Sequence, residues 1–87
     1  MATVKLLDFW APWCGPCKIM NPIIEELEKE LGDKVEVAKI NVDEKPEEAS
    51  KYGVMSIPTY IILKDDKELG RKIGVTSKAD LLKLLQS

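Results

Sequence analysis

The stretch Trp13-Cys14-Gly15-Pro16-Cys17 contains both cysteines of this 87-residue chain and follows a short apolar segment, Val4 to Trp10. Two thiols separated by two residues can form a disulfide within one turn of chain and open it again without unfolding the protein. In a compartment that keeps thiols reduced, a single pair of cysteines with this spacing is more often catalytic than structural. The stretch therefore predicts a reversible two-electron redox site.

The residues on either side of this stretch predict a strand before it and a helix after it. From Val4 to Trp10 apolar side chains fall on both faces, which is typical of a central strand. From Cys17 to Leu31 they recur every three or four residues, as on the buried side of a helix. The unpaired N–H groups at the start of that helix favour the thiolate of Cys14 and lower its pKa from the usual ~8.5. We therefore expect Cys14 to attack a disulfide, and Cys17, one turn further and less exposed, to resolve the product.

The rest of the chain alternates between strand and helix signals. We expect strands over residues 35–42, 59–63 and 68–73, a short helix from Pro46 to about Tyr52, a turn at 65–67 and a last helix that begins with Ser77 and Asp80. The order is then β-α-β-α-β-β-α. The first βαβ unit requires a parallel pair with a right-handed crossover, and the closing hairpin is antiparallel. The prediction is one α/β domain over residues 1–87, with a mixed four-stranded sheet flanked by three helices.

Asp8 shares a strand face with Leu6 and Trp10, where a carboxylate is costly unless it has a use. It lies at the strand end beneath the cysteine turn, so we expect it to accept the proton of Cys17, directly or through a water. Its burial is expected to raise its pKa. Lys39 on the neighbouring strand is the expected countercharge. The simpler alternatives are an ordinary strand-end carboxylate and a lysine that extends into water.

Ile57-Pro58-Thr59 places a proline at the start of a strand. A proline has no N–H to donate, which suits an edge or a site where the backbone stays open. Only ~5% of X-Pro bonds in folded proteins are cis, so composition alone favours the trans form here.

Composition and charge exclude several other classes of protein. A net charge of −2 without a basic patch argues against a nucleic-acid partner. No run approaches the ~18 apolar residues of a membrane span, and residues 1–5 lack the apolar region of a signal peptide, so we expect a cytoplasmic protein. Two cysteines without a histidine cannot close a four-ligand zinc site within one chain. We expect no metal and no cofactor, and a Cys₄ site shared by two chains is the alternative to redox chemistry.

The sequence resembles the thioredoxin family, and the resemblance covers essentially the whole chain in order. Its most specific part is Phe9-Trp10-Ala11-Pro12-Trp13-Cys14-Gly15-Pro16-Cys17-Lys18. It continues through further matching segments, which are Lys39-Ile40-Asn41-Val42-Asp43, Tyr52-Gly53-Val54, Ser56-Ile57-Pro58-Thr59 and Lys72-Ile73-Gly74.

The resemblance implies a thioredoxin-like fold and a protein dithiol–disulfide oxidoreductase. Such an electron carrier reduces disulfides in partner proteins and is itself reduced by thioredoxin reductase. It implies that Cys14 is the nucleophile, Cys17 the resolving thiol, Asp8 the buried proton acceptor and Lys39 its neighbour. It also implies a cis bond before Pro58 and a substrate groove lined by Trp13, Gly15, Pro16, Ile57, Pro58, Thr59 and Gly74.

The sequence departs from the family pattern at two points. A usual member has a further strand and helix before the position of Val4, so we expect the strand 35–42 to be an open edge, guarded by Glu36 and Lys39 in a monomer. Asp66 replaces the glycine usual in the hairpin turn, a position that Asp tolerates.

The alternatives to a general reductase are a glutaredoxin-like or single-partner redox protein, and a non-catalytic subunit that uses the fold for interaction.

Overall fold

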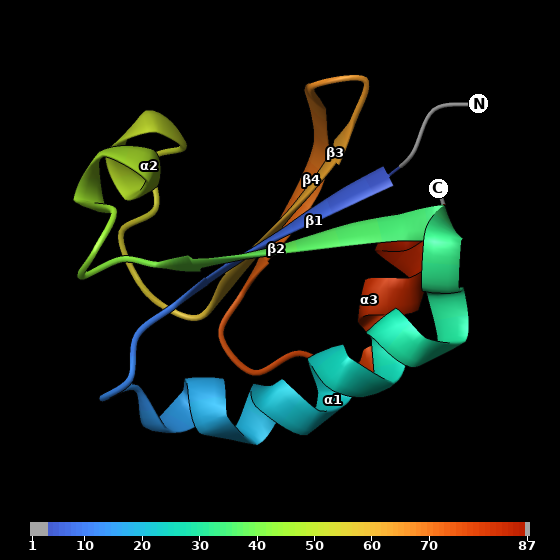
Figure 1. Ribbon diagram of the computed structural model, residues 1–87, viewed down its shortest axis with the longest axis horizontal. Helices are drawn as coiled ribbons and strands as arrows, with labels where there is room; N and C mark the ends of the chain where they lie inside the picture. The colour runs from blue at the N-terminus through green and yellow to red at the C-terminus, as the bar shows by residue number, and fades with distance from the viewer. Residues whose placement is uncertain (1–3, 87) are drawn as a thin grey trace.

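The computed structural model describes residues 4–86 and arranges them around one sheet (Figure 1). Its strands are β1 (Val4–Trp10), β2 (Val35–Asn41), β3 (Thr59–Lys64) and β4 (Lys67–Ile73). Its helices are α1 (Gly15–Leu31), α2 (Pro46–Lys51) and α3 (Lys78–Leu85), with a 3₁₀ turn at Gly32–Lys34. The predicted element order is confirmed, and none of the helices in this part of the chain is long and apolar enough to cross a membrane.

The strands lie in the order β2-β1-β3-β4. β1 runs parallel to β2 and antiparallel to β3, and β3 and β4 form the antiparallel hairpin. The mixed four-stranded sheet is therefore as predicted. Within residues 4–86, β2 has no partner on its outer side, which confirms the open edge.

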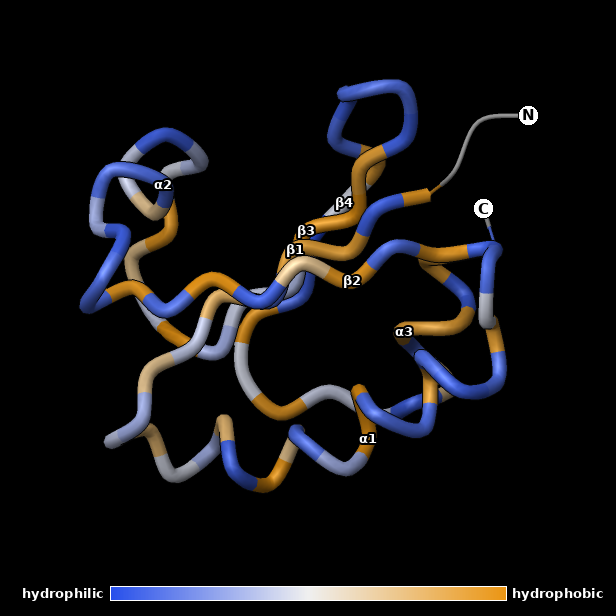
Figure 2. Tube along the Cα trace, viewed as in Figure 1, coloured by the Kyte–Doolittle hydropathy of each residue, from blue (hydrophilic) through white to orange (hydrophobic). Residues whose placement is uncertain are grey.

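Helices cover both faces of the sheet, and each face has its own core. On one face, α1 and α3 pack on the sheet around Leu6, Met20, Ile24, Tyr60 and Leu81. On the other face, α2 and the segment after it pack around Leu7, Phe9, Ile40, Ile61 and Leu63. Figure 2 shows the apolar residues concentrated along the strands, while the β3–β4 turn and much of α2 are polar. Successive residues of β1 thus alternate between two cores, as a central strand requires.

Several element boundaries differ from the prediction, and two of the strand ends, at Asn41 of β2 and Lys64 of β3, do so by one residue. α1 begins at Gly15 and not at Cys17, because the fixed φ of Pro16 suits the first helical turn. The hairpin turn is Asp65-Asp66 alone, with φ of 54° and 65°, so that Lys67 already belongs to β4. Two consecutive positive φ values are typical of the tight turns that match the twist of a hairpin.

Candidate functional site

The two cysteines form a disulfide at the start of α1, and their Cα atoms are 5.3 Å apart. Cys14 is the N-cap residue of the helix, and the N–H of Cys17 donates to its Sγ at 3.2 Å. A sulfur in this position accepts one of the N–H groups that a helix start leaves unpaired. The geometry therefore supports a stabilised thiolate at Cys14 when the disulfide is open.

The predicted difference in exposure between the two cysteines is wrong for the oxidised form, in which each is 3% exposed. Cys14 is buried because it forms a small apolar cluster with Cys17 and Ala11, and Trp10, Val42 and Ile57 pack against that cluster. The turn itself is held by a hydrogen bond of 3.1 Å from the Cys14 N–H to the Ala11 carbonyl. Gly15 and Pro16, between the cysteines, are exposed.

Asp8 is 2% exposed and lies on the α1 face of β1, two residues before Trp10. Its burial raises its pKa from the ordinary 3.8 to about 6, while the charge of Lys39 opposes that rise and the charge of Glu28 adds to it. Lys39 is its register partner on β2 and is exposed. A carboxyl group in this state exchanges protons near neutral pH, as a general base must.

The segment before β3 brings Ile57 against the cysteine cluster and is followed by Pro58. The Ile57-Pro58 bond is cis, and the Pro58 carbonyl accepts a hydrogen bond from the Gly74 N–H at 2.8 Å. The Thr59 hydroxyl donates to the Ser56 carbonyl at 2.6 Å. The side chains of Pro58 and Thr59 are buried, whereas Ile57 and Gly74 are partly exposed.

Pro58 and Thr59, two residues of the predicted groove, have buried side chains. The groove itself stays a prediction. The buried Thr59 hydroxyl is used within the segment, by its hydrogen bond to the Ser56 carbonyl. Ile57, which packs against the cysteine cluster, keeps accessible atoms, and so does Gly74.

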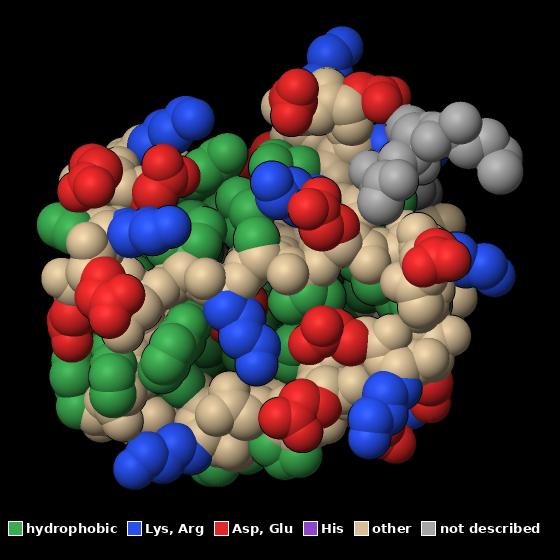
Figure 3. Space-filling view, in the orientation of Figure 1, with side chains coloured by type: hydrophobic (Ala, Val, Ile, Leu, Met, Phe, Trp, Pro, Cys, Tyr) green, Lys and Arg blue, Asp and Glu red, His purple; other side chains and the backbone are tan. Residues whose placement is uncertain are grey.

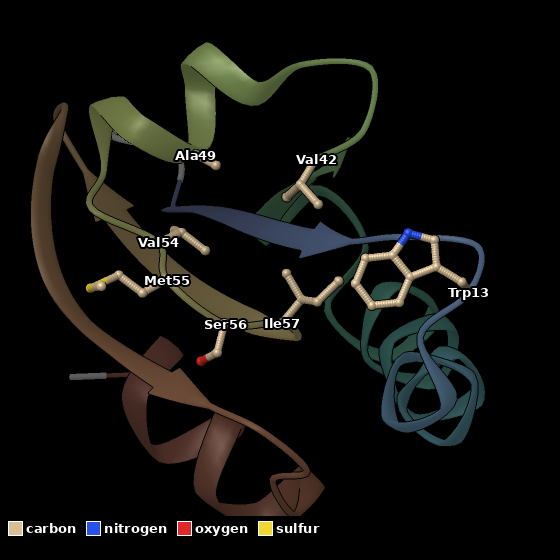
Figure 4. A pocket seen from close by; sticks show the side chains of 7 residues that line it. All are labelled: Trp13, Val42, Ala49, Val54, Met55, Ser56 and Ile57. Atoms are coloured by element: carbon tan, nitrogen blue, oxygen red, sulfur yellow. The ribbon is translucent and has the colours of Figure 1, made fainter.

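An apolar pocket of about 330 Å³ lies next to the disulfide (Figure 4). Trp13, which is 68% exposed, forms one wall and its ring points toward Ile57. The other lining residues come from the position after β2, from α2 and from the segment before Pro58, and they are Val42, Ala49, Val54, Met55 and Ser56. Figure 3 shows apolar side chains gathered where α1 begins, at the lower left. An extended chain with an apolar side chain fits such a surface.

Several of these residues were not predicted from the sequence. Asp43 accepts a hydrogen bond of 2.8 Å from Trp13 Nε1 and so fixes the indole ring over the pocket. Val54 and Met55 line the pocket, and Met55 is 96% exposed. In the sequence, Val54 and Asp43 stood out only as parts of matching segments, and Met55 only by its proximity to Ile57. Among the predicted residues, the structure brings Trp13 and Ile57 to this pocket, and it pairs Gly74 with Pro58 and Asp8 with Lys39.

Comparisons with known proteins agree with one another. Residues 2–87 match the family model described as thioredoxin. The thioredoxin of Bacillus subtilis (strain 168) is 54% identical over 82 residues, which are 94% of this chain and 79% of that protein. That of Rickettsia typhi is 53% identical over 77 residues, 88% of this chain and 73% of that protein.

Solved structures give the same answer for the fold. Thioredoxin-2 of a malaria parasite superposes with a TM-score of 0.93 at 34% identity, over 98% of this chain and 82% of that chain. Fasciola hepatica thioredoxin superposes with a TM-score of 0.89 at 39% identity, over 97% and 79%. The cysteine pair at the helix start is the redox-active disulfide of a dithiol–disulfide oxidoreductase. With a matching family model, relatives that share about half of its residues and the same fold, this chain belongs to the thioredoxin family.

Proposed function

We propose that this protein reduces disulfides in partner proteins, with Cys14 as the nucleophile and Cys17 as the resolving thiol. The observation that carries the proposal is the Cys14–Cys17 disulfide at the N-terminus of α1, next to an apolar pocket open to solvent. The helix start favours a thiolate at Cys14, and the pocket accepts a side chain of the substrate.

The reaction is an exchange of two electrons in two steps. The Cys14 thiolate attacks one sulfur of the substrate disulfide, the substrate S–S bond breaks, and the first substrate thiolate leaves. The enzyme and substrate are then joined by a mixed disulfide. The Cys17 thiolate attacks the Cys14 sulfur and releases the second substrate thiolate, so the substrate is reduced and the enzyme holds the Cys14–Cys17 disulfide.

Asp8 is the proposed acceptor of the Cys17 proton in the second step. Its pKa of about 6 allows it to take a proton from a thiol and return it to solvent near neutral pH. Lys39 limits the rise in that pKa by its positive charge. The substrate backbone lies against the Ile57-Pro58-Thr59 segment and Gly74, between Trp13 and the Gly15-Pro16 turn.

The electron donor in this proposal is thioredoxin reductase, which returns two electrons to the disulfide. The protein works as a cytoplasmic monomer with one domain over residues 1–87. Exposed Glu36 and Lys39 on the open β2 edge support the monomer, because charged side chains discourage strand pairing between molecules.

The test is to trap the mixed disulfide with insulin, a disulfide-bonded protein. Cys17→Ser should form a covalent adduct with an insulin chain that dithiothreitol releases, because the resolving thiol is missing. Cys14→Ser should form none, and neither variant should sustain turnover. An adduct on Cys14→Ser but not on Cys17→Ser would reverse the two roles.

The reduction potential of the pair decides the direction of the reaction. A value well below that of the glutathione couple is expected for a reductase, and a value near or above it would indicate an oxidase or isomerase. Efficient reduction of the disulfide by glutathione, without a reductase, would favour a glutaredoxin-like role. A wild-type protein that is inert toward insulin and toward small disulfides would support a non-catalytic subunit.

A further inference from the structure

We propose that Arg71 is a positioning residue for the substrate-binding segment 53–58, which it holds in place through the carbonyl of Tyr52. Arg71 lies on β4 and touches neither cysteine. Arg71 therefore acts on the reaction only through the position of this segment, which binds the protein substrate. The inference rests on the proposed function.

A bulge in β4 brings Arg71 and Glu68 to the same face of the sheet. In a regular strand, two residues three apart point to opposite faces. Here Ile62 pairs with Gly70 and Leu63 with Glu68, so Leu69 is an extra residue between them. Arg71, opposite Ile61, and Glu68, opposite Leu63, both lie on the face covered by α2.

The bulge thus creates a bidentate ion pair that orients the guanidinium. Arg71 Nε donates to Glu68 Oε2 and Arg71 Nη2 to Glu68 Oε1, each at 2.8 Å. These hydrogen bonds hold the pKa of the Glu68 carboxyl below its ordinary value. A planar fork held at two points has little freedom left, so the third contact of Arg71 is directed.

That third contact is a hydrogen bond of 2.9 Å from Arg71 Nη2 to the Tyr52 carbonyl. Tyr52 is the C-cap residue of α2, where a helix leaves carbonyl groups without intrahelical partners. A guanidinium suits this position because it also carries the charge that a helix C-terminus favours. The Tyr52 ring is fixed as well, edge-on against Phe9 of β1 with 5.9 Å between ring centroids.

β4 and the residue that follows it therefore hold both ends of the segment beside the cysteine cluster. Arg71 binds the carbonyl of Tyr52 at one end, and the Gly74 N–H binds the carbonyl of Pro58 at the other. Between these two anchors lie Val54, Met55, Ser56 and Ile57, all of which line the pocket. The Gly53 and Val54 N–H groups also bind the carbonyls of Ser50 and Ala49 in α2. Loss of the Arg71 anchor therefore loosens the first half of the segment and leaves the cysteine turn untouched.

The experiment compares the kinetics of Arg71→Ala with a large and a small disulfide. With insulin, we expect KM to rise about fivefold and kcat to change less than about twofold, because only binding is impaired. With a small aromatic disulfide, which does not span the segment, the rate should stay at the wild-type value. Arg71→Lys keeps the charge but loses the fork, so its KM should be intermediate.

Lys72→Ala is the matched control, because it removes one positive charge from the neighbouring position of β4. Lys72 lies opposite Tyr60 and so faces the other side of the sheet. It should show the wild-type KM for insulin and the wild-type reduction potential. An equal rise in KM for Lys72→Ala, or an equal loss of rate with both disulfides for Arg71→Ala, would overturn the proposal.

Amide hydrogen exchange separates this proposal from the proposed function. Exchange over residues 53–57 should be faster in Arg71→Ala than in wild type and should not change in Lys72→Ala. If the wild type fails to reduce insulin, the proposed function fails, and the exchange rates still decide whether Arg71 holds the segment. Equal exchange in all three proteins would refute the role of Arg71.

Discussion

The two faces of the sheet differ in how completely they are covered. Under α1 and α3, Leu6, Met20, Ile24, Leu27 and Leu81 are all fully buried. Under α2, the core residues continue into Val42, Val54 and Ile57, which are only partly buried and border the pocket. α1 has 17 residues and α2 has 6, so α2 leaves much of its face to the segment that follows it.

This difference separates stability from substrate binding. Burial of apolar surface stabilises the fold, whereas a partly buried apolar surface beside the disulfide remains available to a partner. Asp8 is the exception, because it is an ionisable group on the closed face. We expect substitutions on the α1 face to change stability and substitutions on the α2 face to change KM.

The largest predicted effect is a loss of stability on the closed face. Ile24→Ala removes a fully buried side chain and leaves a cavity, so the free energy of unfolding should fall by about 3–4 kcal/mol. Val54→Ala, on the partly exposed side, should cost about 1 kcal/mol but raise KM for insulin. Urea unfolding and steady-state kinetics measure the two quantities.

The two variants control each other. The reduction potential of Ile24→Ala should equal that of wild type, since Ile24 does not touch the cysteines. Equal losses of stability in the two variants, or a raised KM in Ile24→Ala alone, would contradict the division between the faces.

How far the sequence predicts these two faces depends on how far apart in the sequence their contacting residues lie. The closed face follows from local spacing, because Met20, Ile24 and Leu27 repeat at the helical period and must share one side. The predicted start of α1, Cys17, is two residues later than the observed start at Gly15, because apolar spacing marks only the buried side of a helix and not its first turn. The helix and its buried side were nevertheless correct.

The pocket could not be predicted in the same way. Val42, Ala49 and Val54 meet Trp13 only through the tertiary fold, and no periodicity connects them. The contact between Arg71 and Tyr52 depends on a bulge at Leu69 that has no clear sequence signal. The buried side chains of Pro58 and Thr59 show the same limit, because a motif identifies a segment but not which of its atoms face outward.

The second prediction concerns Asp8, which costs stability when it is ionised. Its pKa is about 6 in the folded protein against 3.8 in the unfolded chain, so the folded state binds more protons between these values. Stability therefore falls as the pH rises from about 4 to 6 and stays reduced above that range. Asp8→Asn removes this cost and should be more stable than wild type by about 3 kcal/mol at pH 8, with little gain at pH 4.

Urea unfolding of the oxidised proteins at several pH values tests this prediction. Lys39→Gln gives a second check, because Lys39 lowers the Asp8 pKa. Without that charge, the fall in stability should extend to higher pH. A constant difference between Asp8→Asn and wild type at all pH values would show that ionisation of Asp8 is not the cause.

The smallest predicted effect is on the open face, where Asp43 fixes the Trp13 ring. Asp43→Ala removes an exposed hydrogen bond, so stability should change by less than about 0.5 kcal/mol. The ring is then free to rotate over the pocket, and KM for insulin should rise about threefold.

The described chain holds two indoles, Trp10 and Trp13, and their N–H resonances can be followed separately. That of Trp13 should shift and exchange faster in the variant, while that of Trp10, whose Nε1 is buried, should stay in place. Asp43→Asn keeps an acceptor and should retain most of the wild-type signal, so an effect as large as that of Asp43→Ala would show that charge, and not the hydrogen bond, holds the ring.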